Sequence, residues 1–145
     1  MHPPAPLRAA GETFAPTVCY EDAYGSEQLG LVRQSSLLVN VTNDAWFGDS
    51  TAPHQHLDIS RMRALESGRA MLRATNDGVT ALIAHDGGLL GVLPQFQPGV
   101  LTGSIMPRTG FTPYLRFGNG PVLELIYLGL AVGFAGWRIR RGDAG

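Results

Sequence analysis

The C-terminal segment constrains the fold most, because residues 121–137 are almost wholly apolar and residues 125–137 carry no charged side chain. A cluster of arginines follows directly: Arg138, Arg140 and Arg141. A membrane-spanning helix needs about 20 apolar residues, with a range of about 17–25, so the segment is at the short end. It is either a short membrane span or the buried core helix of a soluble domain.

Several features of this segment favour the membrane span. Tyr127 and Trp137 lie toward its two ends, where interfacial aromatic residues gather, and the arginines follow as they do on a cytoplasmic flank. Gly129 and Gly133 are spaced for close helix packing in lipid. Glu124, one turn inside the segment, suits the opposite interface or a partner helix. We therefore expect a transmembrane helix here.

The domain layout follows from this assignment. Prolines and glycines recur between residues 107 and 120, which is typical of a linker. We expect an α/β domain over 1–106, a linker over 107–120, a transmembrane helix over 121–138 and a cytoplasmic tail over 139–145. Residues 1–120 are then expected on the non-cytoplasmic side of the membrane.

Residue patterning predicts a mixed α/β domain before the linker. Short β-prone runs predict strands at 16–20, 37–42, 79–84, 89–93 and 100–105, with a hairpin turn at 86–88. Helices are expected over 22–34 and 54–76, and loops over 1–13 and 43–50. This order of elements is typical of a layered α/β fold.

The longer predicted helix carries several specific expectations. Its apolar face is expected to hold Met62, Leu65 and Leu72, and Gly78 suits a left-handed turn after it. Arg69 and Arg73, four residues apart, are expected on one helical face. They would form either a surface ion-pair ladder with Glu66 or a phosphate contact.

Charge and cysteine content exclude several classes of protein. The net charge is −1 and no basic stripe is present, so we expect no nucleic-acid partner. All eleven basic residues are arginine, so a mechanism that requires lysine must take it from outside this chain. The single cysteine, Cys19, cannot form an internal disulfide. Residues 1–10 lack the apolar core of a signal peptide.

Cys19 lies where a predicted strand ends and a predicted helix begins, which is a common position for the active-site residues of α/β sheets. A lone cysteine is by default a small buried apolar residue. At a helix N-terminus, however, free amides and the helix dipole favour the thiolate. A nucleophilic cysteine also needs a proton acceptor. One arrangement that stays open is papain-like: His54 or His56 as the base, with Asn43 or Asn76 orienting it.

A set of motifs, taken in order, resembles the apolipoprotein N-acyltransferases of the nitrilase, or carbon–nitrogen hydrolase, superfamily. The motifs are Cys19-Tyr20-Glu21, Asn43-Asp44-Ala45-Trp46-Phe47-Gly48, Gln55-His56, Arg61-Met62-Arg63-Ala64-Leu65-Glu66, Leu72-Arg73-Ala74-Thr75-Asn76-Asp77-Gly78-Val79-Thr80-Ala81, Pro94-Gln95-Phe96 and Thr109-Gly110-Phe111-Thr112-Pro113-Tyr114. The resemblance runs from about Pro16 to the C-terminal helix. The aromatic pair of residues 46 and 47 and the terminal apolar segment favour the acyltransferase branch.

This resemblance implies a fold and a set of site residues. The fold is expected to be the C-terminal part of a nitrilase-like αββα sandwich, followed by one transmembrane helix. The family uses a Glu–Lys–Cys triad, with no cofactor and no metal. By resemblance Cys19 is the nucleophile, Glu21 a supporting carboxylate, and the backbone N–H of Tyr20 an oxyanion donor. Trp46 and Phe47 are expected to contact the acyl chain, although core packing is the simpler interpretation of either residue alone.

The resemblance also implies a reaction and its partners. Cys19 would take an acyl chain from a phospholipid as a thioester and pass it to the N-terminal amine of a diacylglyceryl apolipoprotein, at the bacterial inner membrane. The triad Glu and Lys would come from a missing N-terminal part of the same enzyme, since Glu12 is the only acidic residue before Cys19. We therefore expect this chain alone to be inactive. The alternatives are a fragment of a nitrilase-type amidase and a non-catalytic, membrane-tethered remnant.

Overall fold

Six strands form one mixed sheet in sequence order, β1-β2-β3-β4-β5-β6, in a computed structural model that describes residues 5–142. The strands are β1 Leu7–Ala9, β2 Glu12–Val18, β3 Leu37–Asn43, β4 Met71–Asn76, β5 Ala81–Ile83 and β6 Leu89–Val92. The central strands β2, β3 and β4 are parallel, whereas β1, β5 and β6 pair antiparallel at the two sides. The carboxyl ends of the three central strands therefore lie together at one edge.

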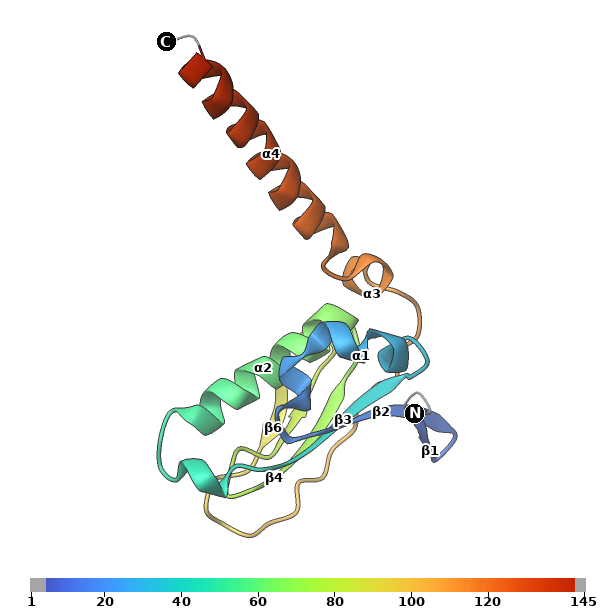
Figure 1. Cartoon of the computed structure of the whole chain (residues 1–145). Coiled ribbons are helices and arrows are strands. Elements are labelled where there is room, and N and C mark those ends of the chain that lie inside the picture. Colours follow the sequence, from blue (N-terminus) through green and yellow to red (C-terminus); the bar gives the residue numbers. More distant parts are fainter. Residues whose placement is uncertain (1–4, 143–145) are drawn as a thin grey trace.

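The helices divide between the sheet and the C-terminus. They are the 3₁₀ helices η1 Cys19–Ala23 and η2 Ala45–Phe47, and the α-helices α1 Gly25–Val32, α2 Ala52–Ser67, α3 Pro113–Phe117 and α4 Gly120–Gly142. Figure 1 shows α1 and α2 on the same face of the sheet, while the segment between β6 and α3 runs along the other side. The predicted α/β fold class is confirmed.

The two faces of the sheet differ in how well they are covered. Side chains alternate across a strand, and those facing the helices form the core, with Ala15, Leu38 and Met71 all buried. On the other face Val18 is 58% exposed and Val41 47% exposed, although both are apolar. The described residues therefore cover one face of the sheet and leave apolar side chains open on the other.

The helix predicted over 54–76 is wrong in its second half. Helix α2 ends at Ser67, and Gly68 follows with a φ of 64°, the left-handed conformation that terminates helices. Residues 71–76 form β4 instead, with Met71 and Arg73 buried on the helix-covered face of the sheet. The predicted apolar helix face is also wrong, because Met62 and Leu65 are exposed. The buried residues of α2 are Pro53, His56, Leu57, Ser60, Ala64 and Ser67.

Other predicted elements shift more modestly. The strands predicted at 16–20, 37–42, 79–84 and 89–93 correspond to β2, β3, β5 and β6, and the helix predicted over 22–34 corresponds to η1 and α1. Residues 7–9 and 12–13, predicted as loop, are strand, and residues 45–47 form η2. Residues 100–105, which were predicted as a strand, form no strand in the structure. In the turn after β4, Asp77 has the positive φ of 56°, not Gly78.

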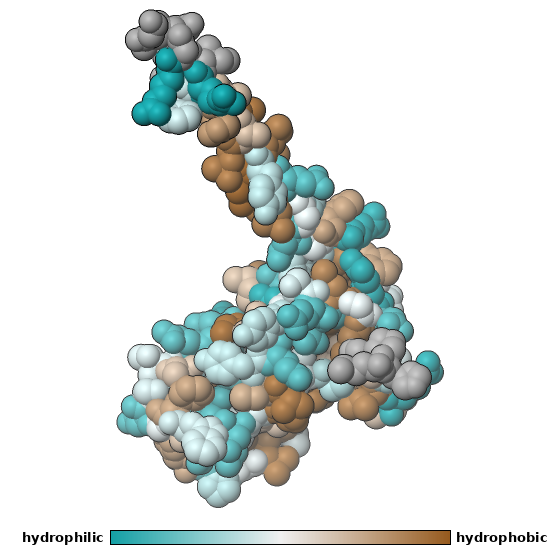
Figure 2. Space-filling view, in the orientation of Figure 1, coloured by the Kyte–Doolittle hydropathy of each residue, from teal (hydrophilic) through white to brown (hydrophobic). Residues whose placement is uncertain are grey.

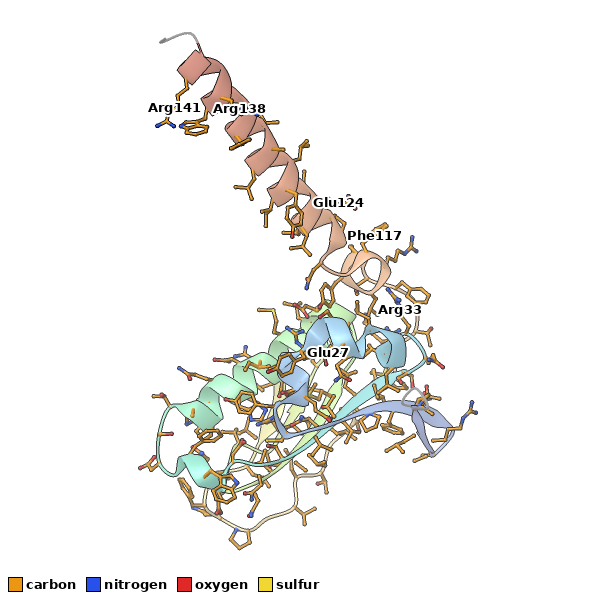
Figure 3. All side chains as sticks on the ribbon, viewed as in Figure 1. Glu27, Arg33, Phe117, Glu124, Arg138 and Arg141 are labelled. Carbon is orange, nitrogen blue, oxygen red and sulfur yellow. The ribbon has the colours of Figure 1, made fainter. Side chains whose placement is uncertain are left out.

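Helix α3 attaches the segment predicted as a linker to the domain. Leu115 is only 1% exposed and belongs to the core. Thr112 caps α3 by accepting a hydrogen bond from the Leu115 N–H at 3.1 Å, and its hydroxyl donates to the Glu66 carbonyl. Arg33 donates from Nε to the Leu115 carbonyl at 2.6 Å, and Figure 3 shows Arg33 lying beneath α3. Because α3 is held by these contacts, the start of α4 is positioned by the domain.

Helix α4 extends away from the domain, and its side chains from Gly120 to Arg138 are all exposed. Residues 120–138 are long and apolar enough to cross a membrane, and none of that window is buried. At about 1.5 Å per residue such a helix spans roughly the 30 Å of a hydrocarbon core. Figure 2 shows its apolar body, and Figure 3 places Glu124 near its start and Arg138 and Arg141 at its far end.

Candidate active site

Cys19 sits at the sharp turn between the carboxyl end of β2 and the helix η1. Its φ is 53°, in the left-handed region that residues other than glycine rarely adopt. Such a backbone costs of order 1–3 kcal/mol and persists only when the surroundings hold it. The side chain is a free thiol of intermediate exposure. The turn therefore presents a reachable thiol on a backbone that other contacts must fix.

Two contacts fix the backbone on either side of Cys19. The Glu21 carboxylate accepts a hydrogen bond from the Val18 N–H at 2.7 Å, which closes the turn from the helix side. From the neighbouring strand β3, the Asn40 amide donates to the Cys19 carbonyl at 3.1 Å and to the Thr17 hydroxyl at 3.0 Å. The Asn40 side chain is fully buried, so its amide is held within the domain.

A cluster of buried charges lies beneath this turn, and we refer to Asp22, Asp44, His56 and Arg73 as the charge cluster. Arg73 donates from Nη2 to Asp44 at 2.9 Å, and its Nη1 lies 3.6 Å from Asp22. All four side chains are fully shielded from solvent. Arg73 also donates from Nη1 to Asn40 Oδ1 at 2.6 Å, so the cluster is connected directly to the residue that holds Cys19.

His56 completes the charge balance of the cluster. Its Nδ1 lies 2.9 Å from Asp44 and its Nε2 lies 3.1 Å from Asp22. A carboxylate oxygen thus lies at each ring nitrogen, an arrangement in which both nitrogens donate when the ring is an imidazolium. Burial lowers the pKa of His56, but hydrogen bonds to Asp22 and Asp44 outweigh it and leave the pKa above its usual value. Two cations then face two anions.

Arg73 remains the fixed cation of the cluster. Burial lowers the pKa of its guanidinium, and the nearby carboxylates of Asp44 and Asp22 oppose that shift. The Ser60 hydroxyl bridges the two charges, donating to Asp22 at 2.6 Å and accepting from Arg73 Nη1 at 2.8 Å. Gly78 lies directly against Asp44, since a Cβ at residue 78 would come within 2.5 Å of Oδ2. Glycine is required there for this close approach, not for a left-handed turn.

The aromatic residues predicted at the site lie beside the cluster. The Tyr20 ring stacks on the His56 ring with centroids 4.5 Å apart, and it meets the Phe47 ring edge-on at 6.2 Å. Trp46, in η2 after β3, is 86% exposed. The structure therefore brings Cys19, Tyr20, Glu21 and Phe47 together at the carboxyl ends of β2 and β3, with Trp46 projecting into solvent. Their roles stay predictions.

The papain-like arrangement does not form in the described part of the chain. Both nitrogens of His56 are occupied by Asp44 and Asp22, so this ring has no free position from which to accept a thiol proton. Asn43 and Asn76 bond to each other at 3.4 Å across β3 and β4. Glu12 begins β2, at the opposite end from Cys19, about 20 Å away at 3.3 Å per residue. His54, the other candidate base, is exposed near the start of α2 and makes no side-chain hydrogen bond with Asn43 or Asn76 among the described residues.

The predicted arginine ladder is also wrong. Arg69 follows the end of α2, is buried, and donates to the backbone carbonyls of Ser35 and Gly110. Arg73 lies on β4 within the charge cluster, and Glu66 pairs with Arg63 instead. The alternation of Met71, Arg73 and Thr75 with Leu72 and Ala74 carried the signal for a strand. An arginine on the buried face of such a strand requires a partner of opposite charge.

No group of three or more His, Cys, Asp or Glu side chains within residues 5–142 has the arrangement of a metal site. In the charge cluster, the positions next to the two carboxylates are taken by Arg73 and His56.

Comparison with known proteins gives consistent results. The sequence profile of the carbon-nitrogen hydrolase family matches residues 5–114. The chain is 52% identical over 119 residues to the apolipoprotein N-acyltransferase of Methylococcus capsulatus, covering 82% of this chain and 24% of that protein. It is 50% identical over 142 residues to that of Chromobacterium violaceum, covering 95% of this chain and 27% of the relative. The chain thus spans about a quarter of the curated relatives it matches.

Solved structures share the fold. An amidase from Nesterenkonia sp. matches with a TM-score of 0.55 at 25% identity, over 68% of this chain and 40% of the amidase. A carbon-nitrogen hydrolase from Helicobacter pylori G27 matches with a TM-score of 0.54 at 12% identity, over 61% of this chain and 39% of the hydrolase. These likenesses confirm the predicted nitrilase-like architecture for the sheet and its helices.

Proposed function

Because this chain belongs to the carbon-nitrogen hydrolase family, we propose that it is the C-terminal part of an apolipoprotein N-acyltransferase with Cys19 as its nucleophile. The observation that carries the proposal is the identity of about half the residues to relatives of that name across most of the chain. The backbone at Cys19 supports it, since a positive φ at a residue other than glycine is typical of functional sites.

The proposed reaction has two steps. The Cys19 thiolate attacks the carbonyl carbon of a phospholipid acyl ester, the C–S bond forms, the ester C–O bond breaks, and the released lysophospholipid hydroxyl takes a proton. The α-amino group of a diacylglyceryl apolipoprotein then attacks the thioester. The C–N bond forms, the C–S bond breaks, and the amine proton returns to a base. In both steps the Tyr20 N–H stabilises the oxyanion, and Glu21 supports the turn.

The aromatic loop supports a lipid substrate. Trp46 is 86% exposed on a short helix beside the site, and a large exposed apolar side chain indicates a contact that is not made within the chain. We assign Trp46 and Phe47 to the acyl chain. A nitrilase-type amidase is the second candidate, favoured by the likeness to the Nesterenkonia amidase. Such an amidase acts on small amides and has no need of this aromatic loop or of α4.

The membrane arrangement is part of the proposal. Helix α4 crosses the bacterial inner membrane with Arg138 and Arg141 on the cytoplasmic side, and residues 1–120 face the periplasm. The missing N-terminal part of the enzyme supplies the Glu and Lys of the triad, since this chain contains no lysine. It also covers the open apolar face of the sheet at Val18 and Val41. The isolated chain is then inactive in acyl transfer.

A chimera tests this proposal. The chain replaces the matching part of the Chromobacterium violaceum relative, which is 27% of that protein, and the rest of the relative supplies the upstream residues. In phospholipid vesicles the chimera is expected to transfer an acyl chain to a diacylglyceryl peptide, detected by the mass of the peptide. The Cys19→Ser chimera, made and inserted equally well, is the control and should transfer none. A folded chimera that releases ammonia from small amides but transfers no acyl chain would establish the amidase instead.

A further inference from the structure

We propose that Asn40 and Arg73 are positioning residues that orient the Cys19–Tyr20 peptide so that the Tyr20 N–H faces the reacting carbonyl. This inference rests on the proposed function, because it concerns the oxyanion site of the same cysteine. It adds a buried pair from β3 and β4 to the residues at the turn, and neither residue touches the substrate.

The argument starts from the peptide plane that joins Cys19 to Tyr20. The peptide is trans, so its C=O and N–H point in opposite directions. The C=O points inward, because it accepts a hydrogen bond from the buried Asn40 amide at 3.1 Å. The Tyr20 N–H therefore points away from β3. As an early residue of η1 it also lies where helical N–H groups have no intrahelical partner.

The side to which this N–H points is open in the described structure. Strand β2 lies between β1 and β3, but β1 pairs only with residues 12–14, at the far end of β2. The edge of β2 opposite β3 is therefore unpaired among the described residues from Ala15 to Val18, the end that leads to Tyr20. A donor on that side is free to meet a substrate oxygen, as an oxyanion hole requires.

Asn40 can hold the plane only if its own amide is held. Its Oδ1 accepts from Arg73 Nη1 at 2.6 Å, which fixes the amide so that its Nδ2 faces the Cys19 carbonyl. Arg73 is fixed in turn by Asp44 through Nη2, at 2.9 Å. The planar guanidinium thus reaches an asparagine and an aspartate with two different nitrogens in a fixed plane, whereas lysine would have to reach both from one nitrogen. The orientation of the Cys19–Tyr20 peptide is therefore set by Asn40, which is itself held by Arg73.

The test separates an effect on the oxyanion from an effect on the thiol. The full chain in detergent carries one cysteine, so two reagents report on Cys19 alone. Iodoacetamide alkylates a thiolate without forming an oxyanion, whereas p-nitrophenyl butyrate acylates it through one. Both rates are measured at the same alkaline pH, so both reagents meet the same fraction of thiolate. The readout is the ratio of the acylation rate to the alkylation rate.

Asn40→Asp is the central variant, because it keeps the size and the acceptor for Arg73 but places an oxygen against the Cys19 carbonyl. The ratio is expected to fall about tenfold or more, since removing a whole oxyanion donor costs about 100- to 1,000-fold. Asn40→Ala and Arg73→Lys are expected to lower the ratio several-fold by releasing the same plane. Ser67→Ala, which removes a buried hydroxyl bonded only within α2, is the control and should leave the ratio unchanged.

Each outcome bears on one proposal. A ratio within about twofold of the parent in any folded Asn40 or Arg73 variant, with the fold checked by thermal unfolding, overturns the positioning role while leaving Cys19 as nucleophile. If instead the parent chain is alkylated by iodoacetamide but not acylated by this activated ester, the Tyr20 N–H stabilises no oxyanion and the positioning role fails. The proposed function is decided separately by the chimera, which also carries the upstream Glu and Lys.

Discussion

The charge cluster beneath Cys19 and the helix α4 depend on their surroundings in opposite ways. Each charged group of the cluster meets an opposite charge from the same chain, in positions closed to water. The side chains of α4 from Gly120 to Arg138 are all exposed. The contacts that hold the thiol site therefore come from this chain itself, whereas α4 needs an apolar environment that the chain does not supply.

Removing Arg73 tests the self-sufficiency of the cluster most severely. Arg73→Met leaves Asp22 and Asp44 buried with only His56 as a cation, and breaking a buried ion pair in this way costs about 3–5 kcal/mol. The free energy of unfolding, measured by urea denaturation in detergent, should fall by that amount. Asp58→Asn is the control, because it removes only the exposed pair of Asp58 with Arg61, which is worth about 0–1 kcal/mol. Equal losses of unfolding free energy in the two variants would show that the buried charge cluster stabilises the domain no more than an exposed ion pair does.

Filling the space at Gly78 should have a smaller effect. In Gly78→Ala the new methyl group meets the Asp44 carboxylate within 2.5 Å, so the carboxylate must move away from Arg73 or His56. A loss of about 1–3 kcal/mol is expected, as for overpacking. Gly30→Ala is the control, since nothing lies within 4 Å and alanine favours a helix, so it should stabilise the domain by about 0.5–1 kcal/mol. An unchanged free energy of unfolding in Gly78→Ala would mean that the Asp44 carboxylate can move without loss of stability.

The protonation of His56 should make the stability of the domain depend on pH. Hydrogen bonds to Asp22 and Asp44 raise the pKa of His56 in the folded state against the effect of burial. Its contribution is therefore complete below the usual pKa of about 6.5 and is lost as the pH rises through the raised, folded-state pKa. The Tm of the chain should fall as the pH is raised from about 6 to 9, by less than Arg73→Met lowers it.

The control for this pH dependence is His56→Gln, which keeps hydrogen-bonding capacity but does not titrate. Its Tm should change less over the same range. A parent Tm that stays level or rises between pH 6 and 9 would contradict the imidazolium.

A change in α4 should leave the domain untouched. Leu130→Arg places a charge near the middle of the apolar segment, where it costs about 2.5–3.5 kcal/mol in membrane insertion. Leu130 is exposed, so the free energy of unfolding of the domain should stay within about 0.5 kcal/mol of the parent. Recovery of the chain in the membrane fraction should drop, and Leu130→Val is the matched control. Loss of the domain fold in Leu130→Arg would show that α4 packs on the domain.

The sequence revealed the elements whose signals are local. The strand before Cys19 and the buried strand at residues 37–42 follow from β-prone runs, and the C-terminal helix follows from its length and composition. The helix prediction over residues 54–76 is wrong after Ser67, because Gly68 interrupts a stretch of good helix formers. The alternation of side chains that marks the strand after Gly68 is short. The motif resemblance brought Cys19, Tyr20, Glu21, Trp46 and Phe47 into view, whatever their final roles.

The charge cluster was not predictable from spacing. Its members come from η1, the loop after β3, α2 and β4, and they meet only because β2, β3 and β4 are adjacent and parallel. The sequence marked His56 only as a candidate base, and no motif or spacing singled out Asp22. One signal was present, the Arg73 side chain within an otherwise β-like run, and it becomes readable only once the strand assignment is correct.

The most direct test of the account is to locate the acyl group in the chimera after incubation with phospholipid and no acceptor. Cleavage after arginine isolates residues 9–33, which contain the one cysteine of this chain. The account predicts an acyl mass on that peptide that hydroxylamine removes and that Cys19→Ser abolishes. A folded, membrane-inserted chimera in which this peptide stays unmodified, or carries an adduct that survives hydroxylamine, would contradict the assignment of Cys19 as the acyl-accepting nucleophile.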